Sequence, residues 1–278
     1  VAVPFVHTDP MGRRTDRRLV TRYRGDEVDR RVDTLAVEEP LEIRVDGEPF
    51  TLTMRTPGDD VELAHGLLRA EGVITTREDV RTARFCTDTG TLNVLELALT
   101  VPGGVPLSSQ RSLAAFGGCG LSGSTTVDAV TERLGGRPVD GEGVTIPPAA
   151  IGTALEGLKA SQKIFARTGG THGAAAATVD GAILHAREDV GRHNAVDKVL
   201  GAVLLGDEPP PPLLVVSSRA GFEIVAKAAV SRVPVLACVS APSSLAVEAA
   251  ERLGVTLVAF ARGDRLTVCT HPGRVAAA

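Results

Sequence analysis

The sequence predicts an α/β protein in which a mixed sheet is covered by helices and a smaller β-rich part comes first. Beyond residue 148, short apolar runs of strand length alternate with longer runs of helical periodicity. Before residue 110, most apolar runs are strand-like. The chain has 278 residues, 43% of them hydrophobic and 23% charged, so it can bury a sizeable core.

We expect four segments along the chain. Residues 1–34 form an N-terminal tail or edge segment, whose first ten residues are interpreted as a tag remnant and take no part in the functional argument. A β-rich part follows over residues 35–110. Residues 111–123 form a flexible loop that carries one cysteine, and residues 124–278 form the α/β domain.

The N-terminal elements follow from local patterns. Residues 11–35 are rich in Arg and Asp and are expected to form a solvated edge strand or tail. Residues 41–56 contain two β-rich runs around Asp46 and Gly47, a pair that accepts the positive φ of a tight hairpin turn. Residues 57–74 have a helical apolar stripe, and we expect an aspartate to cap that helix, either Asp59 or Asp60.

The remaining elements alternate in type. A strand is expected over residues 91–101, a short helix over 124–136 and a longer helix over 147–167, where proline is tolerated in the first turn. The later strands are expected over 181–186, 212–218, 234–240, 255–262 and 265–271, and the later helices over 189–206, 221–232 and 243–254.

Composition argues against several classes of protein. The net charge is −4 and aromatic residues make up 3% of the chain, so we expect no nucleic-acid partner. No apolar run reaches the length of about 18 residues that a membrane helix needs, so we expect no membrane partner. The four cysteines are far apart and form no CxxC pair, which predicts reduced thiols in a cytoplasmic protein, without a disulfide framework or a local zinc knuckle.

Cys119 is the most conspicuous cysteine, because glycines flank it in the run "FGGCGLSG". A thiol acts as a nucleophile or sulfur carrier through its thiolate, and small neighbours leave the sulfur accessible on a pliable loop. The alternative is a small buried residue that merely lies beside glycines, and the residues alone favour neither interpretation. Cys86, Cys238 and Cys269 lie in strand-like runs and are expected to serve core or edge packing.

A second cluster of chemically active residues lies between residues 171 and 199. It includes His172, His193 and several carboxylates, and a helix that starts near Asp189 would place both Asp189 and Asp197 four residues from His193 on one face. The cluster could be an acid/base site or a metal site. The simpler alternative, a capped helix with surface ion pairs, is favoured on general grounds.

Two turns carry arginines next to small residues. Ser217, Ser218 and Arg219 follow an apolar strand and precede a helix, where backbone N–H groups and an arginine can bind an anion, although ordinary N-capping by serine also explains the serines. Residues 262–265, Arg-Gly-Asp-Arg, lie between two strands. A hairpin turn accounts for the Gly-Asp pair but not for the two flanking arginines, which could hold phosphate.

Several stretches resemble one known family. The run "EDVGRHNAVDK" at 188–198 is the most specific of them, and it is accompanied by "GGTHGAA", "SSRAGFEIVAKAA", "FARGDR" and the stretch over residues 38–74. These stretches resemble the FdhD family of formate dehydrogenase accessory sulfurtransferases, and the resemblance covers roughly residues 35–273.

The resemblance implies a cytidine-deaminase-like α/β fold and a sulfurtransferase. Such a protein accepts persulfide sulfur from a cysteine desulfurase and passes it to the metal, molybdenum or tungsten, of a bis(molybdopterin guanine dinucleotide) cofactor for formate dehydrogenase. It implies a homodimer and no permanently bound metal. The implied cofactor-binding residues are Phe260, Ala261, Arg262, Gly263, Asp264 and Arg265, with Ser218, Arg219, His172 and Gly173 as further candidates.

The loop departs from the family pattern, which typically reads Cys-Gly-x-Cys-Gly. Here Phe116 stands at the first cysteine position, so Cys119 is the one catalytic candidate. This departure keeps open a second hypothesis, a non-catalytic chaperone that binds the molybdenum cofactor without moving sulfur. A zinc nucleobase deaminase is disfavoured, because the His/Cys-x-Glu and Pro-Cys-x-x-Cys segments that bind its zinc do not occur.

Overall fold

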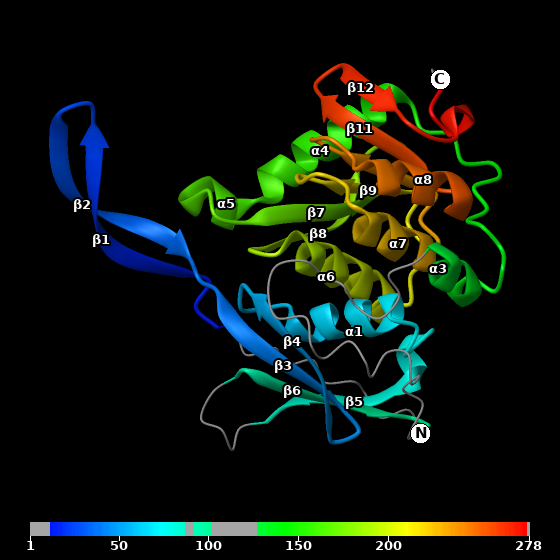
Figure 1. The fold of residues 1–278 in the computed structure, drawn as a ribbon, viewed down its shortest axis with the longest axis horizontal. Helices are drawn as coiled ribbons and strands as arrows, with labels where there is room; N and C mark the ends of the chain where they lie inside the picture. Colours follow the sequence, from blue (N-terminus) through cyan, green and yellow to red (C-terminus); the bar gives the residue numbers. More distant parts are fainter. Residues whose placement is uncertain (1–11, 87–91, 102–126, 277–278) are drawn as a thin grey trace.

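A six-stranded mixed sheet dominates the computed structural model, which describes residues 12–86, 92–101 and 127–276. The strand order is β12-β11-β10-β9-β7-β8 (Figure 1). Strands β9, β10 and β11 run parallel, whereas β7, β8 and β12 are antiparallel to their neighbours, so the predicted mixed sheet is confirmed. The strands are β7 (His172–Ala177), β8 (Ile183–Asp189), β9 (Leu213–Val216), β10 (Val235–Cys238), β11 (Thr256–Arg262) and β12 (Arg265–Val268).

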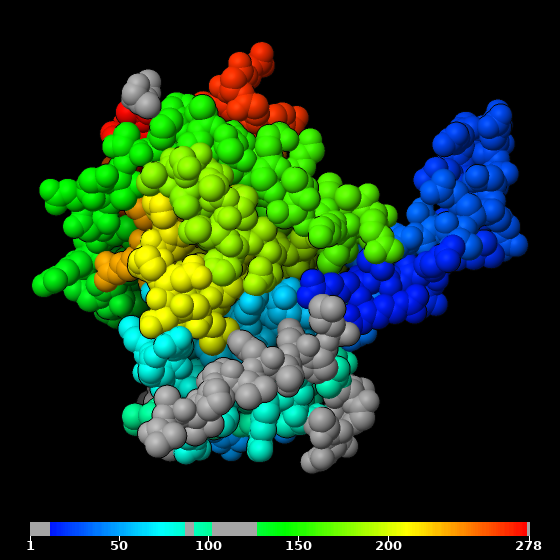
Figure 2. Space-filling view, turned by 180° about the vertical axis from the view of Figure 1, so that it is seen from behind, coloured from blue at the N-terminus to red at the C-terminus, as the bar shows by residue number. Residues whose placement is uncertain are grey.

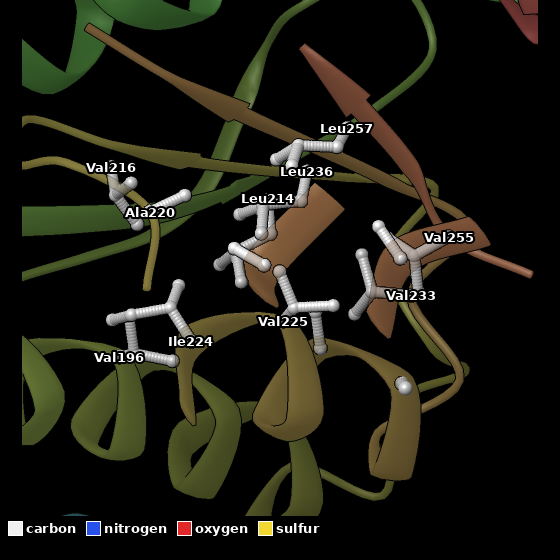
Figure 3. Close-up of a cluster of buried hydrophobic side chains, with 14 of the residues drawn as sticks. Val196, Leu214, Val216, Ala220, Ile224, Val225, Val233, Leu236, Val255 and Leu257 are labelled. Atoms are coloured by element: carbon white, nitrogen blue, oxygen red, sulfur yellow. The ribbon is translucent and has the colours of Figure 1, made fainter. Parts of the chain in front are cut away.

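Helices cover both faces of this sheet, α4 on one and α6, α7 and α8 on the other (Figure 1). Each face of the sheet has its own hydrophobic core. Figure 3 shows the larger one, in which Ile224 and Val225 of α7 face Leu214 and Leu236 of the strands. No helix within the described ranges is long and apolar enough to cross a membrane. The helices are α3 (Val127–Arg133), α4 (Pro148–Ser161), α5 (Lys163–Thr168), α6 (Arg192–Leu205), α7 (Phe222–Val230) and α8 (Ser244–Leu253).

Strand β7 ends in a run of four buried alanines, residues 174–177. Ala174 packs in the core of α6 to α8, whereas Ala175 packs in the core of α4. Since side chains alternate along a strand, His172 faces α6 and Gly173 faces α4. The two predicted site residues at the start of β7 therefore lie on opposite faces of the sheet.

The N-terminal β-rich part contains a second sheet, four-stranded, in the order β4-β3-β6-β5. Helix α1 (Asp60–Ala70) packs on it, and Asp46 and Gly47 have φ angles of 51° and 88°, which confirms the predicted hairpin turn. A 3-10 turn, η1 (Arg77–Asp79), precedes β5. The strands are β3 (Glu39–Val45), β4 (Glu48–Arg55), β5 (Val80–Phe85) and β6 (Val94–Leu99).

Two glycines allow α1 and α6 to cross with their backbones in contact. A Cβ atom on Gly66 would lie 2.0 Å from the carbonyl oxygen of Asp197, and one on Gly201 would lie 1.9 Å from that of Glu62. No real side chain fits at such distances, so glycine is required at both positions. This crossing joins the N-terminal sheet to the larger one.

A two-stranded hairpin, β1 (Thr15–Arg24) and β2 (Glu27–Ala36), projects from the body of the protein. Figures 1 and 2 both show it standing away from the two larger sheets, with its base near α5. The segment expected as a solvated edge strand or tail therefore forms two largely exposed strands that pair only with each other. The strands pair along ten residue positions, from Thr15 opposite Ala36 to Arg24 opposite Glu27.

Two element boundaries also differ from the predictions. The helix expected over 147–167 is interrupted at Gln162, whose ψ of 71° is not helical, so α4 and α5 are separate. The helix expected from residue 189 begins at Arg192, because Asp189 is the last residue of β8.

Asp59 occupies the N-cap of α1, one of the two positions expected for the capping aspartate, but its side chain makes no capping bond. Its carboxylate instead pairs with Arg14 at 2.9 Å.

Candidate functional site

The candidate site lies where the parallel strands β9, β10 and β11 end. In open α/β sheets the carboxyl ends of the strands form the crevice in which ligands bind. Strand β7 is antiparallel to β9 and begins at this edge, which brings Gly173 to Ser217. The Gly173 N–H donates to Ser217 Oγ at 2.9 Å, and the Ser217 N–H donates to the Gly173 carbonyl, also at 2.9 Å. We refer to this region as the carboxyl edge.

The turn between β9 and α7 contributes an exposed arginine to the carboxyl edge. Ser218 is buried and its hydroxyl donates to the carbonyl of Arg219 at 3.0 Å, while the Arg219 side chain is exposed. Gly221 is the N-cap of α7 and no side chain caps the helix, so N-capping by serine does not explain the two serines. Ser217 instead holds the turn against β7, a role that the sequence did not reveal.

His172 belongs to a polar cluster formed by β7, α6 and α7. Burial lowers the pKa of His172, and the nearby Arg192 guanidinium lowers it further. His193 lies 3.8 Å from Glu223 and is the main reason that the pKa of Glu223 is lowered. His172 is therefore neutral at pH 7 and can both donate and accept a hydrogen bond.

Sequence reasoning missed Arg192 and Glu223 as members of this cluster. The Nε atom of Arg192 is buried and has no hydrogen-bond partner among the described residues, so it can donate to a ligand. Arg192 lies inside the specific run at 188–198, and that location is the one signal in the sequence that could have identified it.

The rest of that run has a structural role. Asp189 is buried, accepts the Thr56 N–H at 3.0 Å and pairs with Lys198 at 2.8 Å. Lys198 donates to the Thr56 carbonyl at 2.8 Å, and Asn194 donates to the Met54 carbonyl at 2.8 Å. These contacts fasten the end of β4 to the start of α6, so the motif joins the two sheets.

The expected helical pair of Asp189 and His193 is wrong, because Asp189 ends β8 and lies outside α6. Asp197, by contrast, is on α6 and forms a buried ion pair with Lys227 at 2.7 Å. Burial raises the pKa of Asp197, and the Lys227 ammonium opposes that rise. Within the described ranges, no group of three or more His, Cys, Asp or Glu side chains is arranged to hold a metal ion.

The second arginine-bearing turn, residues 260–265, is the tip of the hairpin between β11 and β12. Arg262 is paired with Arg265 across the hairpin, and Gly263 adopts a φ of 59°. Among the described residues, neither arginine has an acidic partner, and both side chains and that of Asp264 are exposed. The hairpin explains Gly263 and Asp264, and it leaves both arginines available to an anion.

Phe260 is held in a strained conformation at the base of this tip. Its φ is 53°, a left-handed value that is uncommon for a bulky residue, and its side chain is 54% exposed. Its N–H donates to the Ser240 carbonyl at 3.2 Å, while the neighbouring Ala261 is buried against α4. Strain of this kind concentrates at binding sites, and here it turns an aromatic ring into solvent beside two arginines.

Cys238 and Cys269 match the expectation of packing roles. Cys238 is buried, burial raises its pKa to about 11, and its thiol donates to the Ser240 carbonyl at 3.0 Å. Burial also raises the pKa of Cys269. Cys119 and Phe116, with the loop expected over 111–123, lie outside the described residues.

Comparison with known proteins identifies the family. The model of the FdhD/NarQ family matches residues 36–276. The chain is 47% identical over 277 residues to the sulfur carrier protein FdhD of Mycobacterium tuberculosis, covering 95% of this chain and 100% of the relative. It is 44% identical over 275 residues to the sulfur carrier protein FdhD of Streptomyces coelicolor, covering 96% and 97%.

A solved structure is also similar. It is the crystal structure of a candidate formate dehydrogenase accessory protein from Desulfotalea psychrophila, with a TM-score of 0.76 and 25% sequence identity, covering 96% of this chain and all of that one. Family match, sequence identity and fold agree over nearly the full length. The chain therefore belongs to the FdhD/NarQ family.

Proposed function

We propose that this protein carries sulfur for the maturation of formate dehydrogenase. Cys119 accepts persulfide sulfur from a cysteine desulfurase and delivers it to bound cargo, the molybdenum or tungsten bis(molybdopterin guanine dinucleotide) cofactor. In the first step the Cys119 thiolate attacks the terminal sulfur of the donor persulfide, the S–S bond breaks, and the desulfurase cysteine leaves as a thiolate. The name of the relatives, sulfur carrier protein, supports this role. The chemistry needs reduced thiols, which is why we assign it to the cytoplasm.

The observation that carries the proposal is the geometry of the β11–β12 tip. An exposed, strained Phe260 is followed two residues later by Arg262, which pairs with Arg265 across the hairpin, and neither arginine has an acidic partner among the described residues. An aromatic ring can stack on a guanine or pterin ring, and arginines match phosphate groups. An exposed aromatic ring and two arginines in one hairpin therefore suit a guanine dinucleotide, which has both a flat base and phosphate groups.

The rest of the carboxyl edge fits the same cargo. Arg219 is exposed on the β9–α7 turn, and the buried Nε atom of Arg192 has no partner in the part of the chain that the structure describes, so further cationic donors border the crevice. His172, neutral at pH 7, can hydrogen-bond to a polar ligand there without adding charge. Gly173 and Ser217 hold the two sides of the crevice together.

A non-catalytic cofactor chaperone is the second candidate. Phe116 at the position of the family's first loop cysteine favours it, because a relay between two loop cysteines cannot operate here. The two candidates share the binding site and differ only in whether Cys119 receives sulfur.

The deciding experiment loads the protein with ³⁵S from a cysteine desulfurase and maps the labelled sulfane sulfur by mass spectrometry. We expect the label on Cys119 and its loss in Cys119→Ala, while Cys269→Ala, a matched change at a half-buried cysteine, retains it. Label that persists undiminished in Cys119→Ala contradicts the carrier role. Unchanged formate dehydrogenase activation in cells by Cys119→Ala would favour the chaperone.

We also propose that the protein is a homodimer and that the β1–β2 hairpin contributes to its interface. Leu19 lies opposite Val32 and Tyr23 opposite Val28, and all four exposed side chains share one face of the hairpin. A two-stranded hairpin alone is marginally stable in water, so this apolar stripe gains stability when a second copy covers it.

Light scattering during size-exclusion chromatography tests the dimer. Leu19→Glu should dissociate it, whereas Arg18→Glu, on the opposite face of the same strand, should leave it intact. A wild-type chain that runs as a monomer at micromolar concentration contradicts the proposal.

A further inference from the structure

A separate cavity of about 690 Å³ lies away from the tip of the β11–β12 hairpin, at the outer edge strand β8. The start of β1, the N-cap of α1, the end of α4, helix α5 and strand β8 form its walls. Figures 1 and 2 show the base of the β1–β2 hairpin approaching α5 at this end of the molecule. Its volume is typical of pockets that bind small molecules.

The carboxylates that line the cavity already have hydrogen-bond or ion-pair partners in the protein. Asp59 pairs with Arg14 at 2.9 Å and with Arg187 at 3.7 Å, and Arg187 also makes two short bonds to Glu62, at 2.6 and 2.7 Å. Glu188 accepts two backbone N–H groups from the first turn of α5, at 2.7 and 2.8 Å. Four cationic side chains, Arg14, Lys163, Arg167 and Arg187, line the cavity against the two carboxylates of Asp59 and Glu188, so the lining is net positive and favours an anion.

Several donors that line the cavity have no acceptor. Gln162 is 6% exposed, and its Nε2 atom has no hydrogen-bond partner among the described residues. The buried Nε atom of Arg14 lacks a partner as well. Lys163 and Arg167 are exposed on α5, and neither forms an ion pair with another described residue. Buried donors without acceptors are rare in folded proteins and point to a ligand that supplies the oxygens.

The chemistry of these donors specifies the ligand. Lys163 and Arg167 have no acidic partner within the described ranges, and two such cations match a group of charge −2 better than a single carboxylate. The N–H groups of Gln162 and Arg14 that lack acceptors there require several acceptor oxygens. Leu158, Ile164 and Ile183 add apolar surface that suits an organic body. We propose that this cavity binds a small phosphate monoester through Gln162, Arg14, Lys163 and Arg167, independently of the cofactor cargo at the carboxyl edge.

The cavity also contacts the carboxyl edge through one residue. The Gln162 side chain packs on Gly173, where an added Cβ would lie 2.7 Å from Gln162 Cδ. Gly173 in turn bonds to Ser217 in both directions. Gly173 therefore connects Gln162 of the cavity to Ser217 of the β9–α7 turn at the carboxyl edge. A ligand that orders Gln162 would act on that turn through Gly173.

Isothermal titration calorimetry of the full chain tests the inference, with adenosine 5′-monophosphate as the probe and uncharged adenosine as the control. The double variant Lys163→Gln/Arg167→Gln changes only exposed side chains, so it should fold normally. We expect it to weaken binding of the monophosphate about tenfold or more, because charge-assisted bonds are lost. Gln162→Leu should weaken it too, with an unchanged circular dichroism spectrum.

Arg262→Gln separates this site from the proposed function. It should leave binding of the monophosphate unchanged. Binding that is lost in Arg262→Gln and kept in Lys163→Gln/Arg167→Gln places the probe at the carboxyl edge and overturns the cavity site, while the proposed function stands. Absence of binding at millimolar monophosphate, or equal binding of adenosine, also overturns it.

Discussion

Replacement of Gly201 by alanine tests the backbone crossing that joins the two sheets. The new Cβ would lie 1.9 Å from the Glu62 carbonyl oxygen and 2.9 Å from the Gly66 nitrogen. Ordinary van der Waals contact begins near 3.4 Å, so α1 and α6 would have to separate by roughly 1.5 Å at the crossing. The obstacle is backbone, which cannot rotate aside as a side chain does.

The change in the free energy of unfolding of Gly201→Ala is the sum of an overpacking cost and a gain in helix propensity. Overpacking a well-packed interface costs about 1–3 kcal/mol or more, whereas exchanging a helical glycine for alanine gains about 1 kcal/mol. Because the whole crossing must open, we expect the upper part of the cost, and a net loss of about 2 kcal/mol in the free energy of unfolding. Urea denaturation followed by circular dichroism measures it.

Gly157→Ala is the matched control. Gly157 is also helical, but its added Cβ would meet a side-chain atom, Ile183 Cγ1, at 2.7 Å, so one half-buried side chain has to shift and no helix backbone is displaced. We expect a change of less than about 1 kcal/mol there, because the helix-propensity gain offsets the crowding. Equal urea midpoints for the two variants, or a gain in stability for Gly201→Ala, would refute the reasoning about the crossing.

Three further predictions concern the junction, the polar cluster and the strained tip. Lys198→Met leaves the buried Asp189 carboxylate without its cation, so the free energy of unfolding should fall by about 3–5 kcal/mol in urea titrations. Because burial and the nearby Arg192 guanidinium lower the pKa of His172 below its usual 6.5, only the unfolded chain takes up a proton as the pH falls through 6.5. Stability should therefore decline below that pH, and His172→Gln should flatten the decline in melting temperatures measured from pH 8 to 5. Phe260→Gly should relieve left-handed strain and stabilise the fold by about 1 kcal/mol, yet weaken binding of guanosine diphosphate, a fragment of the proposed cargo.

Each of these has a control or a contrary outcome. Adding Asp189→Asn to Lys198→Met should restore part of the lost stability, and an unaltered stability in the single variant would show that the pair is not buried as described. A wild-type pH slope in His172→Gln would remove His172 from the cluster. A loss of stability in Phe260→Gly, measured by thermal melts, would mean that the conformation at residue 260 is not strained.

Local patterns were sufficient where neighbouring residues decide the structure. The Asp46–Gly47 turn was predictable because only residues that tolerate positive φ close a two-residue hairpin, and both adopt it. The strands and helices from β9 onward were predictable because buried parallel strands need continuous apolar runs. The packing roles of Cys238 and Cys269 followed from the same pattern.

Local patterns failed where the partner is distant in the chain. Asp189 was expected in a helix with His193, but its backbone pairs with His172 of β7, so it ends β8, and its carboxylate binds Thr56 and Lys198. The alanine run of β7 has no alternation to reveal a strand. His193 and Glu223 lie 3.8 Å apart only because α6 and α7 start at the same edge of the sheet.

The sequence by itself determined the family, the α/β class and the arginine-bearing turns, because motifs and periodicity are written in consecutive residues. Tertiary structure alone decided that Gly66 and Gly201 must be glycine, that Phe260 is strained into solvent and that Gln162 and Arg14 share a cavity. The physical reason is distance. Each of these features depends on atoms brought within a few ångströms by packing of segments far apart along the chain, and no local pattern records that proximity.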